Sequence, residues 1–170
     1  MTTVRDAERH ADKVLASYWW TTPAQDTPLP IDPFTVAREL GITVEQAALP
    51  HNQSGNIRIS AAGSAIQINW LDSVNRQRFT CAHEIGHHVY RQQHGGVKDD
   101  EVFVDERAQL AGAGVDVMEI YANQFAAALL MPARLVATGI YNQQSPEALA
   151  HLFGTSVQAM NLRLRNLNLA

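Results

Sequence analysis

The residues whose types and spacing could do chemistry stand in one run, His83-Glu84-Ile85-Gly86-His87. Residues four positions apart share a face of a helix, so both imidazoles can reach one Zn²⁺ ion. Glu84 lies about 100° further round the helix, beside the ion, where its carboxylate can take a proton from an attacking water. The motif therefore favours an enzyme that cuts peptide bonds over a protein that only binds a partner.

The sequence around this motif predicts a helix with one buried face. No proline interrupts residues 75–93, and Asp72 or Ser73 can act as the N-cap. Small and apolar residues recur at helical spacing and predict a buried stripe beside the two histidines, namely Phe79, Ala82, Gly86 and Val89. A glycine costs about 1 kcal/mol in a helix interior, which indicates that another backbone or a ligand approaches Gly86 closely. The alternative, a solvated surface helix, gives no reason for this glycine.

A third metal ligand can come from a second predicted helix over residues 116–130, which Pro132 ends. A catalytic zinc ion usually takes three protein ligands and keeps one position open. Glu119 could complete the set, and Asn123, one turn later, could orient a ligand. The pattern Asp116-x-x-Glu119 is also a capping box, in which Glu119 would bond only the backbone, and the spacing alone does not decide. Weaker candidates for the third position are Asp105, Glu106 and His94.

Two longer runs resemble motifs of the ImmA/IrrE family of metallopeptidases. They read RFTCAHEIGH at residues 78–87 and EIYANQFAAALLMP at residues 119–132, and IQIN at residues 66–69 resembles a strand of the same family. The resemblance extends roughly from residue 30 to residue 165. It implies a zincin-like fold in which the zinc ligands are His83, His87 and Glu119. It also implies that Glu84 is the catalytic carboxylate.

The resemblance further implies a cytoplasmic zinc endopeptidase whose substrate is a partner repressor of the helix-turn-helix type. The oxyanion that forms during hydrolysis needs a donor, for which Tyr90, His88 and His94 are candidates. Because some relatives are toxins of toxin–antitoxin pairs, the alternative function is a toxin or regulatory protein that mainly binds its partner regulator. A purely structural zinc ion is disfavoured, since three protein ligands beside a free carboxylate do not make a closed site.

The composition predicts one globular domain without attraction to nucleic acid or membranes. A chain of 170 residues can bury about 70% of its unfolded surface, and its formal net charge of −4 does not favour anionic partners. The N-terminus has no apolar signal core, and the longest apolar run, residues 125–131, is too short to span a bilayer. The single cysteine, Cys81, cannot form an internal disulfide and is expected in the core, consistent with the cytoplasm.

The predicted fold class is α+β, with a small three-stranded, mostly antiparallel sheet packed on helices. The strands are expected over residues 42–46, 55–59 and 65–69, with the last two joined as a hairpin. An edge strand of this sheet could hold a substrate backbone beside the metal. Residues 95–115 are expected to form an extra helix or a flap over the cleft. The other predicted helices span residues 4–20 and run from Asp32-Pro33 to Gly41.

The chain is expected to divide into three parts: an N-terminal helix within residues 1–22, a metallopeptidase core over residues 30–135, and a helix-turn-helix-like segment over residues 145–166. In the last part Ser145 caps one helix, and Thr155 or Ser156 caps the next. Arg163 and Arg165 are too few for a DNA-reading surface on an acidic protein, so packing on the core or docking of a partner is expected instead.

Overall fold

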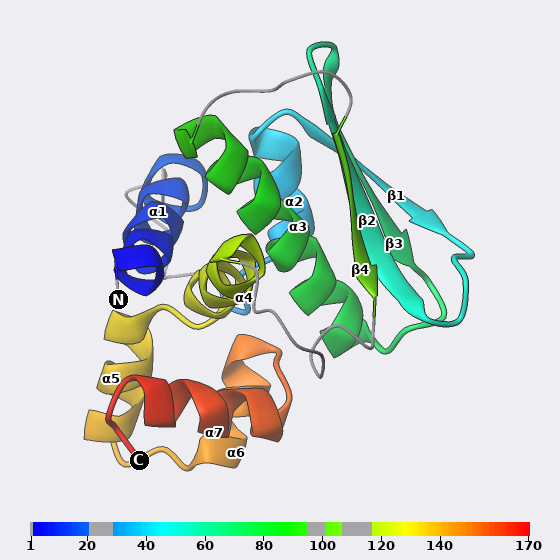
Figure 1. The fold of residues 1–170 in the computed structure, drawn as a ribbon. Coiled ribbons are helices and arrows are strands. Elements are labelled where there is room, and N and C mark those ends of the chain that lie inside the picture. Colours follow the sequence, from blue (N-terminus) through cyan, green and yellow to red (C-terminus); the bar gives the residue numbers. More distant parts are fainter. Residues whose placement is uncertain (1, 21–28, 95–100, 107–116) are drawn as a thin grey trace.

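Helices cover one face of a four-stranded sheet in the computed structural model, which describes residues 2–20, 29–94, 101–106 and 117–170 (Figure 1). In chain order the elements are α1 (Thr2–Tyr18), α2 (Pro33–Glu39), β1 (Ile42–Ala47), β2 (Gln53–Ser60), β3 (Gly63–Asn69), α3 (Val74–His94), β4 (Glu101–Glu106), α4 (Val117–Leu130), α5 (Ala133–Tyr141), α6 (Pro146–Phe153) and α7 (Val157–Asn166). The predicted α+β class is confirmed. The division of the chain into three parts stays a prediction.

The sheet contains the three predicted strands and one more, in the order β1-β3-β2-β4. The predicted hairpin is present, because β2 and β3 are antiparallel and Ser60 pairs with Gly63. β1 runs parallel to β3, and β4 runs antiparallel to β2. The prediction of an extra helix is wrong for residues 101–106, since their backbone pairs with β2 from Ile59 to Gln53. The rest of the 95–115 segment lies outside the described residues.

The helix that carries the histidine motif, α3, packs against one face of the sheet and crosses α4 at very short range (Figure 1). Its start matches one of the two predicted caps, because the Ser73 hydroxyl accepts a hydrogen bond from the Arg76 amide at 3.4 Å. A Cβ atom on Gly86 would lie 2.9 Å from the Cα atom of Ala122 in α4. The close approach predicted from this glycine is therefore the backbone of α4. Only a residue without a side chain lets the two helices meet so closely.

The helices α6 and α7 begin at the predicted caps, and one further helix precedes them. Ser145 caps α6 by accepting from the Ala148 amide at 3.2 Å, and Ser156 caps α7 in the same way. Gly154, with φ of 61°, ends α6 in the left-handed conformation. An unpredicted helix, α5, starts immediately after Pro132, which acts as its N-cap. Pro132 therefore separates two helices that follow each other directly.

Two buried arginines join these C-terminal helices to the rest of the molecule. Arg78 of α3 donates to the carbonyls of Ile31, Phe153 and Gly154 at 2.8, 3.3 and 3.0 Å. Arg163 of α7 has a side chain only 1% exposed; its Nε donates to the Met131 carbonyl at 3.0 Å, and its guanidinium pairs with Glu8 of α1 through both carboxylate oxygens. One of the two arginines that the sequence offered for DNA contact is therefore part of the interior.

Methionine in place of Arg163 is expected to lower the free energy of unfolding by about 2–3 kcal/mol. The loss stays below that of a fully buried pair because Glu8 keeps part of its carboxylate in water. Urea unfolding measures the difference. Arg165→Met, an exposed change on the same helix, is the matched control and should change stability by less than about 0.5 kcal/mol. Equal losses in both variants would contradict the structural role of the Arg163 pair.

Taken singly, each described helix is too short or too polar to cross a bilayer, whereas α4 and α5 together meet the length and composition criteria despite the 50° bend between them.

Candidate metal centre

The two histidines of the motif lie side by side on α3, on the side that faces α4. Their side chains are almost fully buried, with 4% and 2% of His83 and His87 exposed. Their Nε2 atoms are 3.0 Å apart, and the rings meet edge to face with centroids separated by 4.7 Å. The helical period thus brings both imidazoles to one point, as their spacing predicts.

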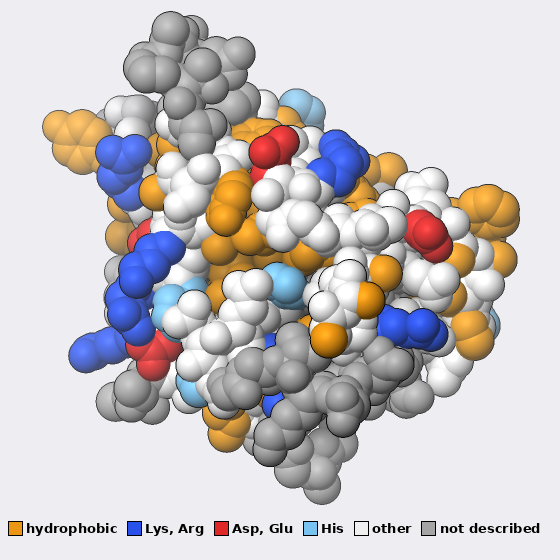
Figure 2. All heavy atoms as spheres, turned by 90° about the horizontal axis from the view of Figure 1, so that it is seen from above, with side chains coloured by type: hydrophobic (Ala, Val, Ile, Leu, Met, Phe, Trp, Pro, Cys, Tyr) orange, Lys and Arg blue, Asp and Glu red, His pale blue; other side chains and the backbone are white. Residues whose placement is uncertain are grey.

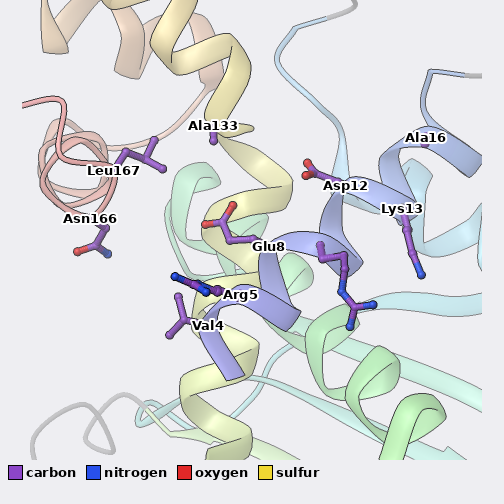
Figure 3. Close-up of a pocket in the computed structure, with 10 residues that line it drawn as sticks. Val4, Arg5, Glu8, Asp12, Lys13, Ala16, Ala133, Asn166 and Leu167 are labelled. Atoms are coloured by element: carbon purple, nitrogen blue, oxygen red, sulfur yellow. The ribbon is translucent and has the colours of Figure 1, made fainter. Parts of the chain in front are cut away.

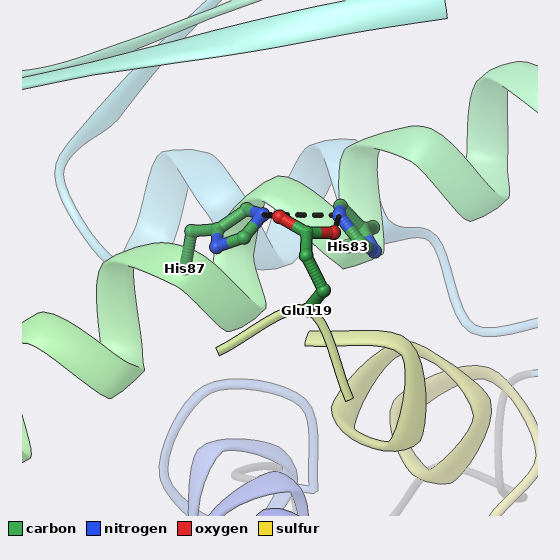
Figure 4. A group of neighbouring side chains, drawn as sticks. All are labelled: His83, His87 and Glu119. Atoms are coloured by element: carbon green, nitrogen blue, oxygen red, sulfur yellow. Dashed lines mark hydrogen bonds and ion pairs between the residues drawn. The ribbon is translucent and has the colours of Figure 1, made fainter. Parts of the chain in front are cut away.

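Glu119 reaches this point from the first turn of α4 (Figure 4). Its carboxylate oxygens lie 3.3 Å from Nε2 of His83 and 3.2 Å from Nε2 of His87. These two contacts, His83 first, hold the pKa of Glu119 well below its usual value, although burial of the carboxylate acts in the opposite direction. The geometry favours the ligand interpretation of Glu119 over the capping box, whose other member, Asp116, lies outside the described residues.

The donor set fits a zinc ion in both chemistry and spacing. Imidazole nitrogens and a carboxylate are common zinc ligands, and a tetrahedral site with bonds of about 2.0–2.1 Å places its ligand atoms about 3.3 Å apart. The two imidazole Nε2 atoms are 3.0 Å apart; Nε2 of His83 lies 3.3 Å from Oε2 of Glu119, and Nε2 of His87 lies 3.2 Å from Oε1 of the same carboxylate. One ligand atom from each of the three residues lies within 4.8 Å of the other two. Within the described ranges, no fourth His, Cys, Asp or Glu joins this group. Such an arrangement leaves a coordination position for water or substrate.

Asn123 orients the first histidine from one turn further along α4. Its Oδ1 atom lies 3.1 Å from Nδ1 of His83. Because an amide oxygen only accepts, Nδ1 carries the hydrogen and the lone pair of Nε2 points to the metal position. The placement is the one expected for a residue that fixes the ring of a metal ligand.

Glu84 and Cys81 flank His83 on α3 and are both completely shielded from solvent. Glu84 follows His83 directly and is 0% exposed. Its role as the base stays a prediction. Burial strongly raises the pKa of the Cys81 thiol, which belongs to the hydrophobic core. The predicted core position of Cys81 is therefore confirmed.

The candidate oxyanion donors, His88, Tyr90 and His94, contact other side chains. Gln92 donates to Nε2 of His88 at 2.9 Å, so Nδ1 of His88 donates to the Ser64 hydroxyl in β3 at 3.0 Å. Tyr90 and His94 stack on each other with ring centroids 4.1 Å apart, and Tyr90 also meets Tyr121 edge to face. A direct part of any of these side chains in the reaction stays a prediction. The side chains of Asp105 and Glu106 lie outside the described part of the chain.

Two residues that the sequence did not single out join α1 to the helix that carries Glu119. Tyr121 follows Glu119 by two positions, and its hydroxyl contacts His10 of α1. The helical pattern marks Tyr121 only as one apolar position among several. Nothing in the local sequence connects it to His10, which is 111 positions away.

The comparisons with known proteins agree with this architecture. The family model Peptidase M78, described as the IrrE N-terminal-like domain, matches residues 37–165. A solved structure of a Mycobacterium tuberculosis transcriptional regulator superposes with a TM-score of 0.55 at 16% identity, covering 96% of this chain and 47% of that chain. At this identity the likeness shows the fold alone, and the chain spans about half the length of that protein. No curated protein matches the chain.

Proposed function

Because the chain belongs to the Peptidase M78 family of IrrE N-terminal-like domains, we propose that it is a zinc-dependent endopeptidase of the cytoplasm. The family implies peptidase activity. The observation that carries the proposal is the convergence of His83, His87 and Glu119, which arrive from two helices with the spacing of zinc ligands. Glu84, which is buried and follows His83 directly on α3, would supply the base of a hydrolase.

Each side chain of the site has its own role in the proposed hydrolysis of a peptide bond. His83, His87 and Glu119 would hold Zn²⁺, which when bound acts as a Lewis acid and lowers the pKa of water. Glu84 takes a proton from the attacking water while the water oxygen bonds to the scissile carbonyl carbon. The same carboxylate then delivers that proton to the leaving amine nitrogen as the carbon–nitrogen bond breaks.

The edge strand β4 offers a place for the substrate backbone. Among the described strands, β1 and β4 form the two edges of the sheet (Figure 1); β1 contacts α2, and β4 contacts α3. An extended peptide can add to such an edge through main-chain hydrogen bonds, which bind any sequence in a fixed direction. A substrate paired with β4 would run past the helix that carries His83 and His87. We therefore propose that the substrate is cleaved in an extended segment.

The proposed substrate is a partner repressor of the helix-turn-helix class. A protein of similar fold is named a transcriptional regulator, which supports a regulatory setting for this fold. Purified chain should be incubated with the helix-turn-helix repressor encoded nearest to its gene, and the products identified by mass spectrometry. Two fragments are expected, and a zinc chelator should prevent their formation until Zn²⁺ is added back.

The alternative function, binding of a partner regulator without cleavage, leads to a different expected result in the same experiment. A toxin or regulatory protein that acts by binding would form a stoichiometric complex with an intact repressor, with or without the chelator. The comparisons give the toxin–antitoxin interpretation no support. An intact repressor in a stable complex would nevertheless replace the peptidase proposal by this one.

A further inference from the structure

We propose that His10 of α1 is a positioning residue for the metal centre, because it holds Tyr121 and thereby fixes the first turn of α4, which carries Glu119. The inference rests on the proposed function, since it assigns α1 a part in building the same site. The helix α1 precedes residues 37–165, which the family model matches. Family membership therefore says nothing about what this helix does.

The contact that carries the inference is a short, buried hydrogen bond between the two helices. Nδ1 of His10 lies 2.6 Å from the phenol oxygen of Tyr121, and the two residues are 7% and 0% exposed. The Arg9 guanidinium, 3.4 Å from Nε2 of His10, can only donate. The proton of the neutral ring therefore sits on Nδ1, which donates to Tyr121. Burial, followed by the charge of Arg9, lowers the pKa of His10 and favours this neutral form.

Tyr121 is the first completely buried residue of α4. The helix begins at Val117, which is exposed, and the next three residues are half-buried, whereas Tyr121 is completely buried. A first helical turn lacks intrahelical partners for its amide groups and frays unless tertiary contacts hold it. The Tyr121 ring meets Tyr90 of α3 edge to face with centroids 5.0 Å apart, and its hydroxyl is held by α1. Two helices thus fix the residue that follows Glu119 by two positions.

The bond matters because a metal site tolerates little displacement of a ligand. Ligand distances must lie within about 0.2 Å of their ideal values, so a small tilt of the first turn of α4 is enough to weaken the site. Glu119 is the one ligand of the three that does not lie on α3. Its placement relative to His83 and His87 therefore depends on how α4 is held against α3 and α1.

The helix α1 has its own attachments, which make it a suitable support. It packs along α4, and Glu8 pairs with the buried Arg163 of α7. On the side of Glu8, an open surface pocket of about 730 Å³ lies between α1 and the C-terminal helices, and Glu8, Asp12, Ala133 and Leu167 are among its lining residues (Figure 3). Figure 2 shows Lys and Arg side chains gathered at the side of the molecule where α1 lies, and the exposed ones on this helix include Arg9 and Lys13. The ion pair between Glu8 and Arg163 holds α1 on this side.

The test measures zinc affinity by competition with a chromogenic chelator, and it needs no substrate. His10→Leu should raise the zinc dissociation constant about tenfold, within the range of about 10–100-fold found when groups that support metal ligands are removed. Tyr121→Phe should do the same, and the double variant should be no weaker than either single one. His10→Asn should keep most of the zinc affinity that His10→Leu loses, because the Nδ2 atom of asparagine occupies the position of the imidazole Nδ1 and also donates a hydrogen bond. His151→Leu, at an exposed histidine of α6, is the control and should bind zinc as wild type does.

The decisive comparison repeats His10→Leu in a Glu119→Ala background. If His10 acts by placing Glu119, the substitution has no further effect on zinc binding there. A tenfold loss in that background as well would show a general disturbance and overturn the inference, as would unchanged affinity in the His10→Leu and Tyr121→Phe single variants. These results differ from failure of the proposed function, in which the wild-type chain itself would not bind zinc. Should His10→Leu not fold, Tyr121→Phe and its own Glu119→Ala combination give the same answer.

Discussion

Glutamine in place of Glu84 is expected to reduce the rate of repressor cleavage by about 10²–10⁴-fold while zinc remains bound. The side chain of Glu84 is 0% exposed, so an amide of the same shape preserves the packing around it. The amide can neither take a proton from water nor deliver it to the leaving amine, so the substitution removes both proton transfers assigned to Glu84. Fragment formation is followed by mass spectrometry, and zinc content is measured by atomic absorption on the same preparation.

The control for this variant is Glu147→Gln, which changes a solvent-exposed carboxylate at the start of α6. It should cleave as fast as wild type. Cleavage by Glu84→Gln at the wild-type rate would remove Glu84 from the mechanism. Loss of zinc from that variant would instead place Glu84 among the groups that hold the metal.

Alanine in place of Glu119 is expected to weaken zinc binding by at least about 100-fold, since loss of a group that only supports a ligand already costs about 10–100-fold. The carboxylate contacts both imidazoles at 3.2 and 3.3 Å, and no other described acidic group joins these three residues. The variant keeps only two ligands, both on α3. Chelator competition gives the dissociation constant, and circular dichroism verifies that the helices are intact.

Glu39→Ala, an exposed carboxylate at the end of α2, serves as the control for this substitution. It removes the same negative charge without approaching the histidine pair, so it separates a local effect from one of net charge. Full zinc retention by the Glu119 variant would exclude this carboxylate as a ligand. The proposed endopeptidase would then lack its third ligand, and the two histidines alone would not support it.

The histidine pair could be predicted from the sequence because a helix repeats locally, whereas spacing alone left the third position open and only the family resemblance assigned it to Glu119. Spacing alone gives Glu119 two partners, the α4 backbone or a distant metal. The choice depends on how α4 meets α3, where a Gly86 Cβ would come within 2.9 Å of Ala122. The glycine indicated that some group approaches there, but not which one. Identifying α4 as that group required the tertiary structure.

Other features depend on contacts between distant segments, which the local sequence does not encode. The edge strand β4 pairs with β2; its central run Val102-Phe103-Val104 favours a strand, but the local sequence does not give the partner of that strand. Helical geometry gives the direction of His88 but not its partner, Ser64, which β3 supplies. The same holds for His10 and Tyr121. The sequence thus predicts which residues share a face, and the fold decides what that face meets.

The burial of Cys81 has a practical consequence for probing the motions of this protein. It is the only cysteine of the chain, it is 0% exposed, and its thiol resists ionisation. Thiolate is the species that reacts with maleimides, so the native side chain should remain unmodified under ordinary conditions. A cysteine introduced by Tyr141→Cys, at a position 86% exposed, would then carry a fluorophore or spin label alone. Fluorescence or spin-label spectroscopy can therefore be performed at one site while Cys81 and the rest of α3 stay unchanged.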